Sequence, residues 1–459
     1  MDSHSSPVAG KAATAGQGAP QTLLSVPDGM FLVIGMVIGV GIFKLPSLVA
    51  GNTTGEAQFL FAWLLGGAVS LCGALVYAEL SSRHPETGGE YTFLLRGLGP
   101  GAAFLCVWSR MTVIQTGVIV AVAFAFGDYA SEILRLGDRS SAIWAAIGVI
   151  ALTALNFAGT LQSKTLQKVM EIVLIAGLLF LAVAGMVVSS TPVPAKPPTE
   201  GGGGDILFAM MFVFFTFGGW NEAAYLAGEV REPRRNMMKI LVGGIVAVTL
   251  LYLLVNIGYL AALGQGGVAG SKAVGADVMR LVAGDAGAKV LALIVCISAL
   301  TTINAAVFTG ARTNFAVGRD YPLFAKLGNW RERGSTPANA LVLQAAITLV
   351  LIFAAATTAR DGFDAMVAYT APVFWTFFLL TGITLFVLRR KRNAARADFK
   401  VPLYPVVPLI FCTMCGFMLW KALAYIFNPQ YGPKFGNLVL AGLLVMLAGI
   451  PLYWFARRK

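Results

Sequence analysis

The strongest constraint on this chain is its series of long apolar runs, which have the length of membrane-spanning helices. A helix needs roughly 20 mostly apolar residues to cross the hydrocarbon core of a bilayer, and about twelve runs meet that length. They occupy residues 29–50, 58–80, 101–127, 141–159, 169–189, 205–228, 238–263, 288–311, 338–358, 364–388, 404–426 and 436–456. Because 57% of the residues are hydrophobic and 12% are charged, the chain has too little polar surface for a soluble domain of this size. The sequence therefore predicts an all-α membrane protein with about twelve transmembrane helices in contact with the lipid bilayer.

Lysine and arginine are distributed unevenly among the connections between these runs. If the N-terminus is cytosolic, the cytosolic segments include the three densest basic stretches, at residues 231–239, 389–400 and 457–459. An excess of lysine and arginine in cytosolic loops is typical of membrane proteins. We therefore expect a multi-pass protein of the plasma (inner) membrane with both termini cytosolic. The same distribution explains the net charge of +12 without a nucleic-acid partner.

The remaining segments predict no separate soluble domain. Residues 1–25 are rich in alanine, glycine and serine and lack the apolar core of a cleavable signal peptide, so they predict a disordered cytosolic tail. The proline- and glycine-rich segment 191–204 predicts a loop between the fifth and sixth runs. Residues 26–459 are therefore expected to form a single transmembrane domain.

Residues that commonly bind metals or perform catalysis are sparse. The chain has five cysteines, all inside apolar runs, and its two histidines are His4 and His84. Neither histidine neighbours a cysteine or another histidine, so the pattern predicts neither a zinc site nor a histidine-based catalytic triad. The apolar runs also lack a paired carboxylate or an activated serine. We expect no metal, no cofactor and no enzymatic activity.

Glycines interrupt two of the apolar runs near their middle. Gly35, Gly39 and Gly41 lie in the first run, and Gly218 and Gly219 lie in the sixth. Glycine lowers helix stability and lets the backbone unwind. The spacing of Gly35 and Gly39 also fits simple close packing between two helices. However, interruptions at matching positions of two halves favour a secondary transporter built from inverted repeats.

Unwound backbone at membrane depth needs partners for its peptide groups. Each unpaired N–H or C=O costs several kcal/mol in hydrocarbon, so such segments occur where they are buried in protein or line a wet cavity. The half-helix that resumes after Gly41 offers free N–H groups and a positive dipole end to a carboxylate. The freed carbonyls of the two interrupted runs can receive an ammonium group. The breaks therefore predict a binding site for a zwitterion.

Several motifs in chain order resemble one transporter family. They read IGVGIFKLP at 38–46, FTFGGWNEAAYLAGEVREPRRN at 215–236, SALTTINAAVFTGAR at 298–312 and FKVPLYPVVP at 399–408. These motifs resemble elements of the amino acid-polyamine-organocation superfamily, and within it the L-type amino acid transporters and their prokaryotic relatives. The resemblance implies a five-plus-five inverted repeat with discontinuous helices 1 and 6. It also implies two additional helices at about 404–459, alternating access, and frequent exchange of one amino acid for another.

The resemblance further implies which residues bind the substrate. Backbone N–H groups of Val40, Gly41 and Ile42 would bind the carboxylate, while carbonyls of Ile38 and Phe215 would bind the amino group. Phe215 also matches the aromatic residue that closes over the substrate from outside. The full set at these motif positions is Ile38, Gly39, Val40, Gly41, Ile42, Phe215, Phe217, Gly218, Gly219, Asn221, Ser298, Thr302 and Asn304.

The chain departs from the family pattern at three places. Val40 replaces the usual serine of the first-helix motif, so the backbone alone must hold the carboxylate. Residues 172–174 are Ile, Val and Leu where some relatives carry a lysine that stands in for a sodium ion, which leaves lysine-based proton coupling without its residue. No cysteine lies between residues 128 and 141, so no disulfide-linked heavy subunit is expected.

Five charged residues in or beside apolar runs are candidates for coupling or gating, because charge at membrane depth is costly. Lys44 fits a contact with a substrate side chain or a gate carboxylate, or simple snorkelling to the interface, which we favour. Arg110 fits transport or a pairing with an acid or an aromatic face. Glu171 fits a proton site or, as we favour, a helix-start carboxylate stabilised by the dipole. Glu222 follows the second break and is best placed for coupling to substrate or proton, while Glu229 fits an inner gate or a solvated loop.

These features favour a secondary active transporter of a small-molecule substrate, a neutral amino acid, working as an exchanger or a proton-linked symporter. A channel is the first alternative, but the sequence shows no filter motif or array of pore charges. An amino acid sensor on the same fold would carry the same site, so it stays an alternative.

Overall fold

The computed structural model describes residues 24–85, 88–158, 164–188, 205–271, 273–331, 336–358, 361–391, 396–424, 426–427 and 432–457. The first half contains α1 (Val26–Val37), α2 (Gly41–Gly51), α3 (Glu56–Arg83), α4 (Gly89–Gly97), α5 (Pro100–Ser109), the π-helix η1 (Arg110–Ile114), α6 (Gln115–Ile133), α7 (Ser140–Ala158) and α8 (Lys164–Val187). The second half contains α9 (Ile206–Thr216), the 3₁₀-helix η2 (Trp220–Glu229), α10 (Pro233–Gly270), α11 (Val274–Asp320), the 3₁₀-helix η3 (Pro322–Gly328), α12 (Ala338–Thr358), α13 (Gly362–Arg390), α14 (Val406–Ala424) and α15 (Gly432–Arg457). Extended pairing in the described ranges is limited to two isolated bridges.

The described helices are numerous and apolar enough to make the chain a multi-pass membrane protein. Ten of them have the length and composition to cross a bilayer, and the bent pair α1 and α2 brings the number to eleven. Helix α8 adds a shorter apolar stretch, Glu171–Val187. Each predicted apolar run falls largely on one helix or on one broken helix.

Two helices extend well beyond their predicted apolar runs. Helix α10 continues to Gly270 past a kink at Gly264, whose φ is +64°, and α11 contains non-helical angles at Ala283 and Gly284. Glycine adopts positive φ without steric cost, so the chain turns there and resumes as helix. Hydropathy windows follow only the apolar part and therefore miss these polar extensions. Gln265 Nε2 donates a hydrogen bond of 2.7 Å to Thr53 O, which fixes the α10 extension against the connection between α2 and α3.

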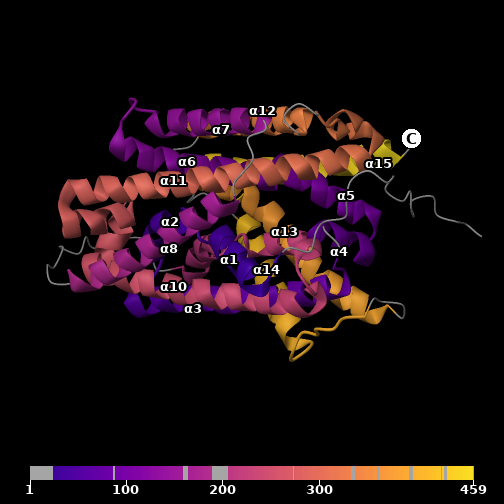
Figure 1. Cartoon of the computed structure of the whole chain (residues 1–459), viewed down its shortest axis with the longest axis horizontal. Coiled ribbons are helices and arrows are strands. Elements are labelled where there is room, and N and C mark those ends of the chain that lie inside the picture. Colours follow the sequence, from indigo (N-terminus) through magenta and orange to yellow (C-terminus); the bar gives the residue numbers. More distant parts are fainter. Residues whose placement is uncertain are drawn as a thin grey trace, which may run out of the picture.

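The two broken helices lie inside the bundle and contact each other. Helix α2 packs against α9, α1 packs against η2, and both α1 and α2 pack against α10. Along one side of the bundle α7 lies beside α12, and along the opposite side α3 lies beside α10 (Figure 1). Trp63 of α3 contacts the rings of Phe217 and Tyr252, which anchors α3 to the second broken helix and to α10. This arrangement surrounds the two breaks with protein.

Two residues of the predicted N-terminal tail belong to the folded structure. Leu24 pairs with Val230 at the end of η2, and Arg231 N donates to Leu24 O at 3.0 Å. Ser25 caps α1 and donates to Asp28 Oδ2 at 2.6 Å. The rest of that predicted tail, residues 1–23, and the predicted loop 191–204 lie outside the described residues.

A buried carboxylate joins the end of α3 to the end of α13. Glu79 is fully buried, accepts hydrogen bonds from Arg83 and Arg389, and accepts a further bond of 2.7 Å from Val401 N. Both arginines form ion pairs with it. Buried charges are stable when they are paired and hydrogen-bonded. Glu79 therefore ties α3, α13 and the segment before α14 together.

We expect Glu79→Ala to lower the thermal stability of the purified protein in detergent. The substitution leaves Arg83 and Arg389 without their carboxylate, and removing one partner of a buried ion pair costs about 3–5 kcal/mol. The unfolding midpoint, followed by intrinsic tryptophan fluorescence, measures the effect. Glu56→Ala is the matched control, because Glu56 is exposed at the start of α3 and should leave the midpoint unchanged. Equal midpoints for the two variants would contradict a stabilising role of Glu79.

Candidate functional site

The first predicted break is present at the expected glycines. Helix α1 ends at Val37 and α2 begins at Gly41, with a bend of 53° between them. The backbone N–H groups of Gly39, Val40, Gly41 and Ile42 donate to no group in the described part of the chain. The first N–H groups of a helix have no partner within it, and they carry its positive dipole end. The start of α2 therefore presents a set of unpaired donors suited to a carboxylate.

The second predicted break is also present, but its second half is not an α-helix. Helix α9 ends at Thr216, and the chain resumes at Trp220 as the 3₁₀-helix η2. Gly219 has φ +106°, and a Cβ on it would lie 2.4 Å from Met36 O at the end of α1. Glycine is thus required here both by its conformation and by the close approach of α1. No pattern in the sequence predicts the 3₁₀ conformation of this segment.

Tyr252 links the two breaks, and the sequence motifs do not identify it. Its hydroxyl lies 2.9 Å from Val37 O and 3.2 Å from Thr216 O, which are the last residues of α1 and α9. The final carbonyls of a helix have no partner within it, so a hydroxyl donor stabilises both ends. The available signal was a tyrosine in the middle of the seventh apolar run. Tyr252 holds the two ends at a fixed separation.

The other residues predicted beside the breaks pack around them. Ile38 is buried, and Gly41 lies close to Thr216, with a built Cβ 3.3 Å from Thr216 Cγ2. Phe215 contacts Phe363 of α13 edge to face, with the ring centroids 5.6 Å apart. The two remaining predicted residues of this group are Phe217, which packs on Trp63 and Tyr252, and Gly218, which lies at the break itself.

The predicted residues of α11 make their hydrogen bonds away from the breaks. Thr302 Oγ1 donates to Ser298 O at 3.1 Å within α11. Asn304 Oδ1 accepts a hydrogen bond of 2.6 Å from Asn156 of α7. The structure thus groups the residues of the two breaks and ties Asn304 to a neighbouring helix.

An ion cluster lies beyond the first break, on α2. Lys44 Nζ is 2.6 Å from Asp128 Oδ2 of α6 and 3.0 Å from Asp361 Oδ2, which caps α13. The ammonium group also lies 4.9 Å from the centroid of the Phe363 ring. We call these four residues the Lys44 cluster. The expectation that Lys44 snorkels to the interface is wrong, because its side chain is only 9% exposed and is paired with two carboxylates.

A second polar cluster lies beyond the other break, around η2. Arg110 forms an ion pair with Glu222 at 2.6 Å, and its guanidinium lies 4.4 Å from the centroid of the Tyr225 ring. The predicted pairing of Arg110 with an acid and with an aromatic face is confirmed on both counts. Asn221 Nδ2 donates to Glu90 Oε1 of α4 at 3.0 Å. Arg110 begins η1, and such π-helical turns are frequent at functional sites.

Glu171 does not lie at the start of its helix. Helix α8 begins at Lys164, so Glu171 is two turns inside it, and the interpretation as a dipole-stabilised helix start is wrong. A Cβ on Gly35 would lie 2.3 Å from Glu171 Oε1, so the carboxylate rests directly on the backbone of α1. Gly35 is needed for this contact rather than for unwinding. The side chain of Glu229 lies outside the described residues.

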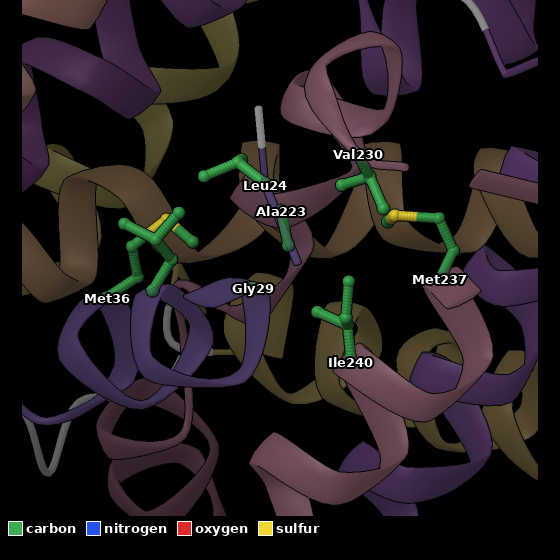
Figure 2. Close-up of a pocket in the computed structure, with 8 residues that line it drawn as sticks. Leu24, Gly29, Met36, Ala223, Val230, Met237 and Ile240 are labelled. Atoms are coloured by element: carbon green, nitrogen blue, oxygen red, sulfur yellow. The ribbon is translucent and has the colours of Figure 1, made fainter. Parts of the chain in front are cut away.

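A narrow apolar seam runs between α1 on one side and η2 and α10 on the other. Its labelled lining residues in Figure 2 are Leu24, Gly29, Met36, Ala223, Val230, Met237 and Ile240. A Cβ on Gly29 would lie 2.5 Å from Ile240 Cδ1, so α1 approaches α10 closely. The seam offers no charged group to a substrate. It forms the contact surface along which α1 and η2 meet.

The comparisons with known proteins agree with this geometry. The family described as "Amino acid permease" matches residues 24–450. The chain belongs to this family. The permease is 26% identical to the serine/threonine exchanger SteT of Bacillus subtilis (strain 168), over 93% of this chain and 95% of the relative.

Animal transporters are similar to the permease at the same level. It is 27% identical to the b(0,+)-type amino acid transporter 1 of Mus musculus, over 85% of this chain and 80% of the relative. It is 26% identical to the cystine/glutamate transporter of Homo sapiens, over 93% of this chain and 83% of the relative. The permease is therefore an amino acid transport protein of the membrane rather than an enzyme.

Proposed function

We propose that the permease is a secondary active transporter that moves neutral L-amino acids by alternating access. The observation that supports this proposal is the pair of adjacent breaks, where the N–H groups at the start of α2 have no partner in the described part of the chain and the carbonyl ends of α1 and α9 meet at Tyr252. A zwitterion satisfies both sets of groups. The proposed architecture is a twelve-helix, five-plus-five inverted repeat in the plasma membrane with cytosolic termini.

The proposed preference for substrates with neutral side chains follows from the pairing of the nearby charged residues with one another. Lys44 is paired with Asp128 and Asp361, and Arg110 is paired with Glu222. A substrate with a charged side chain would have to break one of these pairs. A neutral amino acid uses the backbone groups alone, and the printed name of the Bacillus relative, a serine/threonine exchanger, is consistent with that.

The proposed binding residues are those at the breaks, with the residues of α11 at the periphery. The N–H groups of Val40, Gly41 and Ile42 hold the carboxylate, and the carbonyl oxygens of Ile38 and Phe215 receive the ammonium group. Phe215 closes over the substrate together with Phe363, which it already contacts. Exchange of amino acids and proton-linked symport both fit this site. No covalently linked heavy subunit is part of the proposal.

Counterflow in liposomes tests the proposed function. Purified permease is reconstituted with unlabelled serine, alanine or leucine inside, and labelled forms of the same amino acids are added outside. We expect accumulation of labelled neutral amino acids well above that in protein-free liposomes, and little accumulation of labelled lysine or glutamate. The absence of both net uptake and counterflow for every neutral amino acid would overturn the transport proposal and favour a sensor. Equal counterflow of lysine or glutamate would overturn only the proposed side-chain preference.

A further inference from the structure

Glu90 occupies a buried position that neither the substrate site nor the ion pairs explain. It is the second residue of α4 and is 4% exposed. The two residues before it, Gly88 and Gly89, have φ of +132° and +47°. A Cβ on Gly89 would lie 2.7 Å from the Tyr225 ring. The two glycines thus allow the chain to turn tightly and bring the Glu90 carboxyl against η2.

The two oxygens of the Glu90 carboxyl are in different environments. Oε1 accepts hydrogen bonds from Tyr77 Oη at 2.6 Å and from Asn221 Nδ2 at 3.0 Å. Among the described residues, the polar partner of Oε2 is Tyr225 Oη, at a long distance of 3.4 Å. Oε1 is therefore satisfied as an acceptor, whereas Oε2 has room for a proton that it can donate to Tyr225 Oη.

The charges around Glu90 do not balance. No lysine or arginine in the described part of the chain forms an ion pair with Glu90, and its bonds come from neutral donors. Arg110 is a cation whose charge acts on Glu90, but it is paired with Glu222. When both glutamates are ionised, the cluster has one positive and two negative charges. Protonation of Glu90 makes this cluster neutral, which burial favours.

The titration of Glu90 is influenced by groups on every neighbouring element. Its titratable or charged neighbours are Tyr77 from α3, Cys106 from α5, Arg110 from η1, and Glu222 and Tyr225 from η2. Helix α13 also packs against α4, and its Arg389 is held by Glu79. Burial raises the pKa of the Glu90 carboxyl above the ordinary range of a glutamate. Protonation of Glu90 is thus accessible at milder acidity than for a glutamate in water.

We propose that Glu90 is the proton-binding residue of this permease and that its protonation state controls the movement of η2. This inference rests on the proposed transport function and assigns its coupling ion. The proton enters from solvent on one side, binds Oε2, and is released to solvent on the other side in the same cycle as the substrate. Glu222, which sequence analysis placed first for this role, is instead the counter-charge of Arg110.

The link to the substrate site runs through two residues of η2. Asn221 and Tyr225 both donate to Glu90, and Asn221 lies two residues after the break at Gly219. Hydrogen bonds to an ionised carboxylate are roughly twice as strong as those between neutral groups. Ionised Glu90 therefore holds η2 in the position seen here, and protonated Glu90 holds it more weakly. A proton at this position favours the release of η2 that alternating access requires.

Simultaneous measurement of substrate and proton movement tests the proposal. Liposomes that contain the permease and a trapped pH-sensitive dye receive labelled serine outside, at a series of external pH values. We expect uptake to acidify the lumen and to fall ~tenfold for each pH unit above the Glu90 transition, because the protonated fraction falls tenfold per unit. Glu90→Gln fixes the neutral form, so its uptake should be independent of pH and move no proton. Glu56→Gln, at an exposed glutamate, should keep the wild-type profile.

Two further variants keep the test decisive. Tyr77→Phe removes a donor to the ionised carboxyl, so the midpoint of the pH profile should shift to higher pH. Glu90→Asp keeps a titratable group and should retain proton movement with a shifted midpoint. Infrared difference spectra of the wild type should show the carbonyl stretch of a protonated carboxyl that is lost in Glu90→Gln.

The outcomes separate this inference from the transport function. Counterflow by the wild type without luminal acidification during net uptake would overturn the role of Glu90 and leave transport standing. Proton movement that persists in Glu90→Gln would also overturn it. If Glu90→Gln does not fold, an unshifted pH profile in Tyr77→Phe overturns the proposal and a shift to higher pH supports it.

Discussion

We expect Gly219→Ala to reduce counterflow to the level of protein-free liposomes. At φ +106° an alanine is strained, and its Cβ would lie 2.4 Å from Met36 O. This neighbour is backbone, so it cannot turn aside as the end of a flexible side chain would. To make room, α1 and η2 must separate, which displaces the carbonyl ends that Tyr252 holds together. Each ~1.4 kcal/mol that this displacement adds to the free-energy barrier of transport lowers the rate tenfold. The loss should exceed two orders of magnitude.

Gly416→Ala is the matched control for this substitution. Gly416 lies in α14, and a Cβ built on it meets nothing within 4 Å. Alanine is a better helix former than glycine, so this variant should fold and transport as the wild type does. Size-exclusion profiles in detergent establish that both variants are folded. Wild-type counterflow by Gly219→Ala would show that the close approach of η2 to α1 is not needed for transport.

The sequence was sufficient to locate the membrane-spanning segments and both breaks, because each depends on local composition. Runs of apolar residues identify a span wherever they occur. Glycines in the middle of such a run, as at Gly41 and Gly219, indicate where the helix can unwind. In both cases the physical cause lies within the segment itself. The all-helical, multi-pass fold and the positions of the two breaks could therefore be predicted without a structure.

The sequence was not sufficient to identify the partners of the charged residues. Lys44 and Asp361 are separated by 317 positions, and Arg110 and Glu222 by 112. Whether such residues meet depends on how the helices pack, which hydropathy does not describe. A charge within an apolar run signals that a partner exists but not which residue it is. For this reason the sequence alone favours an interfacial Lys44 and a Glu222 that couples to substrate or proton, whereas the structure pairs both residues with partners on other helices.

The composition of a segment also does not predict where its helix starts or which type of helix it forms. Glu171 was placed at a helix start because the apolar run begins near it, whereas α8 begins seven residues earlier, at Lys164. Apolar composition likewise does not distinguish the π-helical turn at Arg110 or the 3₁₀ conformation of η2 from an ordinary α-helix. Glu90 lies outside every predicted apolar run and was not considered. The role that we propose for it depends on the way that α4 folds against η2.

We expect Lys44→Met to reduce counterflow by removing the two ion pairs that join α2 to α6 and to the start of α13. Without the ammonium group, Asp128 and Asp361 face each other with no cation between them. The ammonium group is buried but the two carboxylates are 34% and 41% exposed, so the loss is smaller than that of a fully buried pair. A cost of about 1–3 kcal/mol corresponds to a roughly 5- to 150-fold smaller population of the state in which these helices are joined. The rate of counterflow measures this change. Lys44→Arg keeps the charge and should retain substantial activity.

Two comparisons show whether this effect comes from the ion pairs themselves. Arg280 also faces several carboxylates, but its side chain is 43% exposed, so Arg280→Met should change counterflow by less than about twofold. In the Lys44→Met background, Asp361→Asn removes one of the two facing charges while keeping a side chain that can cap α13. The double variant should therefore transport faster than Lys44→Met alone, because residues that interact directly are not additive. Additive losses in the double variant would instead assign the effect to the packing of Lys44 against Phe363.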